Sequence, residues 1–102
     1  MAALVVLYKT PKHPAAFDAY YFSKHVPLAK RIPKLRKYDV SQGGVMSPAG
    51  ASGVYLVATL TFDSMADVQA AFASPEGQAA AGDIGNFADA GADILFFDTR
   101  QV

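Results

Sequence analysis

The chain has 102 residues, of which 52% are hydrophobic and 18% charged, and this composition predicts one folded domain over residues 1–102. Nine basic side chains balance nine acidic ones, which argues against nucleic acid as a partner because phosphate binding needs a positive surplus. Cysteine is absent, which excludes disulfides and thiolate metal sites. No apolar run or leader pattern indicates a membrane span or secretion, so we expect a cytoplasmic protein.

The first third of the chain predicts a strand followed by a helix. Residues 2–9 contain the continuous β-forming run LVVLY, typical of a strand that is covered on both faces. Two prolines then mark a turn, and the second suits the first turn of a helix expected over residues 14–32. Pro27 removes a helical hydrogen bond, so we expect this helix to be kinked or interrupted near residues 24–27. Its apolar face follows helical spacing through Phe17, Tyr20, Tyr21 and Leu28.

The middle of the chain predicts two more strands. Residues 35–42 alternate between two sides, and residues 43–53, with four glycines and a proline, predict a flexible loop. Residues 53–63 give the clearest strand signal of the chain. One of its faces is fully apolar and the other is mixed, as in a sheet with one drier and one wetter side.

The last third predicts helical segments and a final strand. Ser64 and Asp67 resemble a capping box. The dipeptide Ser74-Pro75 restarts a helical turn with an N-cap and a first-turn proline. Residues 77–90 are rich in Ala and Gly, with Ile84 and Phe87 as apolar anchors, and residues 93–100 read as a strand.

The element order β-α-β-β-α-β predicts an α+β fold, the ferredoxin-like sandwich. Two main helices would cover one face of a four-stranded antiparallel sheet. The other face carries aliphatic and aromatic residues from at least the first and third strands. An exposed apolar patch of that kind predicts association, most simply a two-fold homodimer of facing sheets.

His25 and Tyr38 are the residues that suggest proton chemistry. Histidine exchanges protons near neutral pH, and His25 lies four residues after Tyr21, on the flank of the apolar helix face. The alternative for His25 is a partly buried side chain at a helix end, and for Tyr38 a packed strand residue. Six basic residues fall between positions 24 and 37. They read as a solvated surface, with attraction of an anionic substrate as the second possibility.

Several aromatic residues suit the wall of a pocket for a ring-bearing ligand: Tyr20, Tyr21, Tyr55, Phe72 and Phe87. For all five, an ordinary core position is the more common role. His13 is expected on the surface and Asn86 in a turn. Two histidines without carboxylate partners at ligand spacing predict no metal site, and the glycine-rich segment lacks nucleotide-binding spacing.

The run F-x-x-Y-Y-x-x-x-H-x-P-L-x(4)-P-x-L-x-x-Y over residues 17–38, with LVVLYKTP before it and SPEGQ after it, resembles the EthD family of the dimeric α+β barrel superfamily. The resemblance covers nearly the whole chain. It implies a ferredoxin-like monomer, a barrel-forming homodimer and a pocket between helices and sheet. Methylmuconolactone isomerases look similar over this run, with a histidine matching His25 and a tyrosine matching Tyr38. Their mechanistic cysteine has no counterpart here, which counts against the same reaction.

Two hypotheses of function follow. In the first, a cofactor-free enzyme uses His25 to move a proton on a small apolar or aromatic carbonyl compound, while Tyr38 helps to stabilise an enolate. Isomerisation, cyclisation, dehydration and decarboxylation all fit. In the second, the protein is a non-catalytic binding or accessory module of a degradative oxidase system. Haem binding, which occurs in the same superfamily, is a third possibility.

Overall fold

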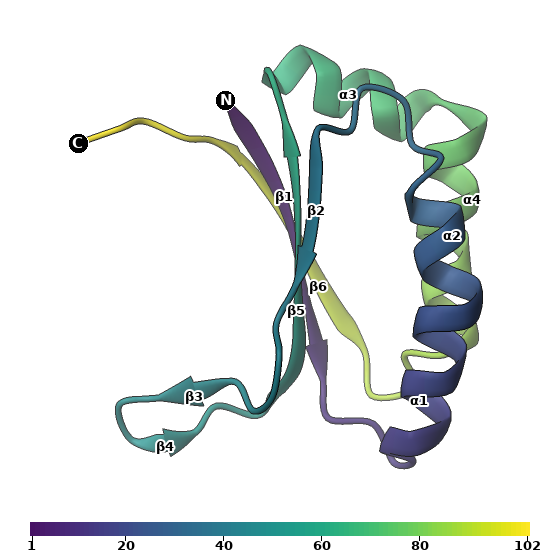
Figure 1. Ribbon diagram of the computed structural model, residues 1–102, viewed down its shortest axis with the longest axis vertical. Helices are drawn as coiled ribbons and strands as arrows, with labels where there is room; N and C mark the ends of the chain where they lie inside the picture. The colour runs from purple at the N-terminus through teal and green to yellow at the C-terminus, as the bar shows by residue number, and fades with distance from the viewer.

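Figure 1 shows the computed structural model, which describes all 102 residues as one twisted sheet with helices on one face. In chain order the elements are β1 Ala2–Lys9, α1 Pro14–Tyr20, a π-helical turn Tyr21–His25, α2 Val26–Ala29, β2 Lys37–Val40, β3 Met46–Ser47, β4 Gly50–Ala51, β5 Val54–Phe62, α3 Met65–Ala73, α4 Pro75–Asp83, a 3-10 turn Ile84–Asn86 and β6 Ala92–Asp98. The main sheet is antiparallel, in the order β2-β5-β1-β6. The predicted ferredoxin-like fold is confirmed.

The glycine-rich segment 43–53 is not a featureless loop, and that prediction was wrong. Strands β3 and β4 pair in it as a small hairpin in which Ser47 faces Gly50. Gly50 has a φ of 114°, which a residue with a Cβ rarely adopts. The hairpin projects on the side of the main sheet that lies away from the helices (Figure 1).

The predicted interruption of the first helix takes the form of a π-helical turn. Pro27 has no amide hydrogen, and its ring would collide with the carbonyl of the preceding turn of a regular helix. The chain widens just before it, and the Val26 amide donates to the Tyr21 carbonyl, five residues back. Tyr21 and His25 both point inward at this turn, with 0% and 5% of their surface exposed. Wide turns of this kind often occur at functional sites.

Local sequence signals explain the second helical layer. The Ser64 hydroxyl accepts from the Asp67 amide at 3.2 Å, which is the N-cap hydrogen bond of the predicted capping box. The Ser74 hydroxyl accepts from the Gly77 amide at 3.0 Å, so α3 ends and α4 begins at one residue. The inward side chains of β5 are at most 5% exposed, at Leu56, Ala58, Leu60 and Phe62. They form the floor on which α3 and the α1–α2 layer pack.

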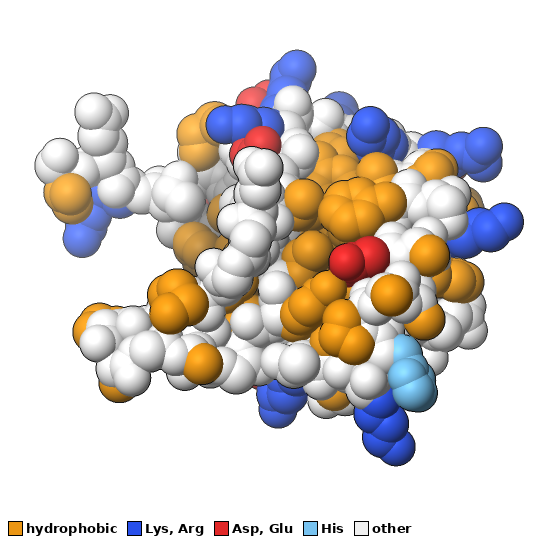
Figure 2. All heavy atoms as spheres, turned by 60° about the horizontal axis from the view of Figure 1, so that its bottom comes forward, with side chains coloured by type: hydrophobic (Ala, Val, Ile, Leu, Met, Phe, Trp, Pro, Cys, Tyr) orange, Lys and Arg blue, Asp and Glu red, His pale blue; other side chains and the backbone are white.

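The edge strand β6 stays largely uncovered. Leu95 and Phe97 are 51% and 45% exposed, and their pairing with Val5 and Ala3 places them on the face away from the helices. Figure 2, in which the bottom of Figure 1 comes forward, shows hydrophobic side chains gathered around an acidic one, with Lys and Arg near the rim. None of the helices has both the length and the apolar character needed to cross a membrane.

Candidate functional site

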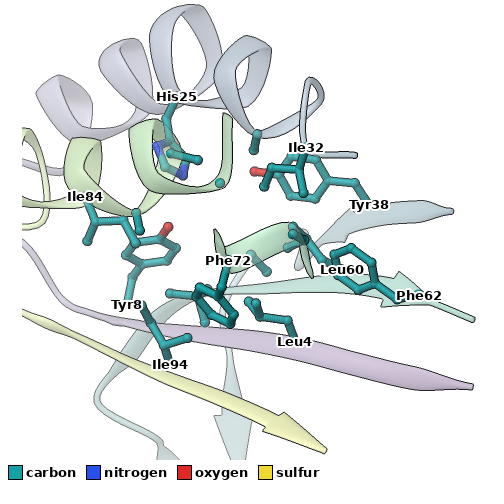
Figure 3. Close-up of a pocket in the computed structure, with 17 residues that line it drawn as sticks. Leu4, Tyr8, His25, Ile32, Tyr38, Leu60, Phe62, Phe72, Ile84 and Ile94 are labelled. Atoms are coloured by element: carbon teal, nitrogen blue, oxygen red, sulfur yellow. The ribbon is translucent and has the colours of Figure 1, made fainter. Parts of the chain in front are cut away.

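A pocket lies between the inner face of the sheet and the helical layer. Seventeen residues line it, fifteen of them hydrophobic, and they come from β1, β2, β5, β6, the helices and the turns beside them (Figure 3). The cavity volume is about 50 Å³, within a recess of about 530 Å³ that includes open solvent at its mouth. Three side chains with polar tips, Tyr8, His25 and Tyr38, are part of this wall. Figure 3 shows both hydroxyls and the imidazole turned toward the same space.

His25 is held by a buried carboxylate. Its Nδ1 lies 3.0 Å from Oδ2 of Asp83, the last residue of α4. The other oxygen of Asp83 accepts from the Tyr20 hydroxyl at 2.6 Å and from the Asn86 amide at 2.9 Å. Burial alone would raise the pKa of Asp83, but hydrogen bonds from Tyr20, Asn86 and His25 outweigh it and lower the pKa below its ordinary value. Asp83 is therefore a carboxylate at neutral pH.

His25 itself is neutral at that pH. Burial lowers its pKa below the ordinary 6.5, and the hydrogen bond and charge of Asp83 only partly oppose the shift. A neutral imidazole beside a carboxylate carries its proton on the nitrogen that faces the carboxylate. The network thus assigns the proton to Nδ1, which leaves Nε2 with a free lone pair. That nitrogen is the basic atom available to the pocket.

Three tyrosines form a second polar cluster beside the histidine. The hydroxyls of Tyr21 and Tyr38 lie 2.6 Å apart, and Tyr21 has no exposed surface. Burial raises the pKa of Tyr21, Tyr38 and Tyr8, and hydrogen bonding to Tyr21 lowers the pKa of the other two in part. All three remain protonated phenols at neutral pH. Each can therefore donate one hydrogen bond.

The residues expected at the site separate into two groups. His25, Tyr38 and Phe72 line the pocket. The other four lie elsewhere: Tyr20, Tyr21, Tyr55 and Phe87. Tyr21 stands behind the wall, because its ring belongs to the core between the sheet and the first helix.

Tyr20, Phe87 and Tyr55 have other surroundings. Tyr20 donates to Asp83, and Phe87 packs on the His25 ring at a centroid distance of 4.8 Å. Tyr20 and Phe87 also border a separate depression near His13. Tyr55 donates to Asp18 at 2.9 Å and does not reach the pocket. Tyr55 lies at the bulge of β5 opposite Tyr8 and Lys9, and its ring packs edge-on against Phe17 of α1.

The six basic residues between positions 24 and 37 are all exposed, and none lines the pocket. Arg36 makes an ion pair with Asp63 at 2.7 Å. No group of three metal-ligating side chains is gathered anywhere in the structure. The basic residues therefore belong to the surface and contribute no charge to the lining of the apolar pocket.

Sequence reasoning missed Asp83 and Tyr8. Asp83 lies 58 residues from His25, and nothing local marks the pair. The only signal is an acid in an Ala-rich helix, three residues before Asn86. Tyr8 follows Leu4 and Val6 at a spacing of two, so it lies on the inward face of the strand. Reading the LVVLY run as uniformly buried hid this polar tip.

Comparison with known proteins shows which family the chain belongs to. Residues 9–91 match the model of the EthD domain. An uncharacterised 11.0 kDa protein from the thcB–thcC intergenic region of Rhodococcus erythropolis is 41% identical over 102 residues, covering all of this chain and 98% of that protein. The crystal structure of an EthD family protein from Bacillus halodurans is 34% identical, with a TM-score of 0.89, and the match covers 98% of this chain and 99% of that one.

More distant solved structures share the fold. SnoaB, a cofactor-independent oxygenase from Streptomyces nogalater, is 16% identical with a TM-score of 0.68, over 99% of this chain and 94% of that one. A dimeric ferredoxin-like protein from Thermobifida fusca is also 16% identical, with a TM-score of 0.67, over 96% of this chain and 90% of that one. The family match spans most of the chain, and two relatives exceed 30% identity over nearly their full length. The chain belongs to the EthD domain family.

Proposed function

We propose that this protein catalyses proton transfer on a small carbonyl compound without a cofactor, with His25 as the acid/base and Tyr38 as a donor to the carbonyl oxygen. One observation carries the proposal. A neutral histidine, oriented by a buried carboxylate, shares a narrow apolar pocket with a protonated phenol. An apolar pocket with a few convergent polar groups and perturbed pKa values is the usual form of an active site.

The proposed chemistry follows from these groups. His25 Nε2 takes a proton from the carbon next to the carbonyl, and the electron pair of that C–H bond forms a C=C bond. The carbonyl π electrons move to the oxygen, which accepts a hydrogen bond from the Tyr38 hydroxyl. Asp83 stabilises the imidazolium that results. Return of the proton to another atom gives isomerisation, and loss of a leaving group gives dehydration. A positioned base contributes about 10²–10⁴-fold to such a step.

The test needs no knowledge of the natural substrate. Proton abstraction next to a carbonyl exchanges that hydrogen for deuterium in D₂O, and ¹H NMR follows the exchange in simple ketones and aldehydes. We expect the wild-type protein to accelerate the exchange and His25→Gln to abolish the acceleration. His13→Gln is the matched control, because His13 is exposed and lies outside the pocket. Equal rates in wild type and His25→Gln, for a ketone that binds, would rule out the proposed role.

The second candidate is a binding or accessory module. It is favoured by the narrowness of the cavity, about 50 Å³, and by its almost wholly hydrophobic lining. Saturable binding of a ketone with no exchange would support it over catalysis. The haem hypothesis fits less well, because a cavity of this volume holds only about three to five water-sized groups.

We propose further that two copies associate through the open face of the sheet. Leu95 and Phe97 are about half exposed on that face, and apolar surface of this kind favours a covered state. A two-fold arrangement places the same strands of both copies against each other.

A further inference from the structure

The pocket contains no charged group that would compensate a charged ligand. Fifteen of its seventeen lining residues are hydrophobic, and the other two are His25 and Gly77. His25 is neutral at ordinary pH because burial lowers its pKa. No lysine or arginine belongs to the lining, although six basic residues lie between positions 24 and 37.

This wall is unfavourable for an anion. A carboxylate inside the pocket would lose its hydration without gaining a cation, which is costly in an apolar environment. Asp83, which is ionised, lies directly behind the His25 ring and would repel it. A neutral molecule meets neither penalty. The charge pattern therefore selects against acids.

The same wall is well suited to an uncharged oxygen atom. Tyr38 lies on β2 and Tyr8 on β1, with β5 between these strands, and both hydroxyls face the cavity (Figure 3). Tyr21 stands behind them, wholly buried, with its oxygen 2.6 Å from that of Tyr38. When Tyr21 donates to Tyr38, the Tyr38 proton is free for a ligand. The Tyr8 hydroxyl also interacts with that of Tyr21. When the single Tyr21 proton points to Tyr38, the Tyr8 hydroxyl is free to turn its own proton toward a ligand oxygen.

The volume of the cavity restricts the class of ligand further. A cavity of about 50 Å³ corresponds to about three to five water-sized groups, since one water needs roughly 10–15 Å³ by the same measure. The enclosed part therefore fits the oxygen and a few carbons, and any larger portion of a ligand extends into the open recess.

We propose that this pocket takes a small uncharged aldehyde or ketone and excludes carboxylates, and that Tyr8 is a second donor to the ligand oxygen beside Tyr38. The inference deepens the proposed function and rests on it for the identity of the site. It adds a catalytic-site residue that sequence reasoning did not select. Under this proposal, the six basic residues between positions 24 and 37 do not take part in substrate binding.

The test compares three ligands of similar shape by NMR titration of the Tyr and His ring signals at pH 8. Cyclopentanone has a strong acceptor, chlorocyclopentane a poor one, and cyclopentanecarboxylate a charge. We expect saturable binding of cyclopentanone, with the carboxylate at least about 100-fold weaker. In Tyr8→Phe, the affinity ratio of cyclopentanone to chlorocyclopentane should fall about 2- to 10-fold, and Tyr38→Phe should act likewise. Tyr55→Phe is the matched control and should leave the ratio unchanged.

Using a ratio within each variant cancels any general change in pocket shape or stability. The ligand class is overturned if the carboxylate binds as tightly as the ketone, or if cyclopentanone produces no saturable shift up to its solubility limit. The role of Tyr8 is overturned if the ratio in Tyr8→Phe equals that of wild type. Tyrosine-dependent ketone binding without deuterium exchange would uphold this inference while refuting the proton-transfer function.

Discussion

Replacing Asp83 with asparagine should reverse the proton positions on His25 while leaving the shape of the site intact. One oxygen of Asp83 accepts from both Tyr20 and Asn86, and the other accepts from His25 Nδ1. The amide oxygen of the variant will occupy the first position, because two donors meet there. Its NH₂ group then faces Nδ1, which must become an acceptor. The ring proton moves to Nε2, and the pocket loses its base.

The energetic cost can be worked from the same three contacts. A hydrogen bond to a charged partner contributes about 1.5–3 kcal/mol, and a neutral one about 0.5–1.5 kcal/mol. Each contact therefore weakens by about 1 kcal/mol, and the smaller desolvation cost of a buried amide offsets part of the sum. We expect the free energy of unfolding to fall by about 1–2 kcal/mol, equivalent to a decrease of about 5–15 °C in Tm. The variant should still fold.

Long-range ¹H–¹⁵N NMR of the imidazole distinguishes the two tautomers directly. In wild type we expect Nε2 to give the signature of an unprotonated nitrogen, and in Asp83→Asn that of a protonated one. His25→Gln identifies the signals that belong to this ring. Deuterium exchange of a bound ketone should fall about 10²–10⁴-fold in Asp83→Asn. An unprotonated Nε2 in the folded variant would refute the assigned role of Asp83.

Three further predictions concern stability and assembly. The pKa of His25 in the folded state lies below its ordinary 6.5, so the unfolded state binds the proton more readily as pH falls. Stability should therefore decrease from about pH 6.5 downward, and denaturant titrations of His25→Gln should lack this component. Gly77→Ala should destabilise by about 1–3 kcal/mol or more, because a Cβ there would collide with a main-chain carbonyl of α3. Gly82→Ala in the same helix meets open space and should not destabilise, and equal thermal shifts would contradict this packing. Leu95→Lys should shift a dimer toward monomer in analytical ultracentrifugation, whereas Phe22→Lys, an equally exposed change on a helix, should not, and a monomeric wild type would exclude the proposed interface.

The features predicted from sequence are those encoded by residues close together in the chain. The caps at Ser64 and Ser74 depend on a hydroxyl and an amide three residues later, and the alternation along β5 depends on neighbouring residues. Pro27 likewise predicts a helix interruption by its own chemistry. Segment 43–53 was harder, since the same glycines suit either a loop or a tight hairpin, and only the pairing of Ser47 with Gly50 decides between them.

The candidate site was predicted only in part, because its geometry depends on distant segments. His25, Tyr38 and Phe72 line one pocket, but they come from different elements. The ionisation of His25 is set by Asp83, 58 residues away. The direction in which Tyr20 and Tyr55 point is also set by tertiary packing. Composition and spacing identify which side chains are capable of proton chemistry, and the fold determines which of them meet.

The π-helical turn makes the geometry of the site depend on the number of residues in the segment Tyr21–His25 as well as on which residues they are. A regular helix rotates by about 100° per residue, and this turn accommodates one more residue than a regular turn would. Because the extra residue is absorbed within this one turn, deleting a single exposed position there would let a regular helix form with its two halves in nearly the same orientation. Pro27 would then lie inside a regular helix, where it has no amide hydrogen to donate and its ring meets the carbonyl of the preceding turn. The segment should therefore tolerate substitutions on its outer surface better than the loss of a residue.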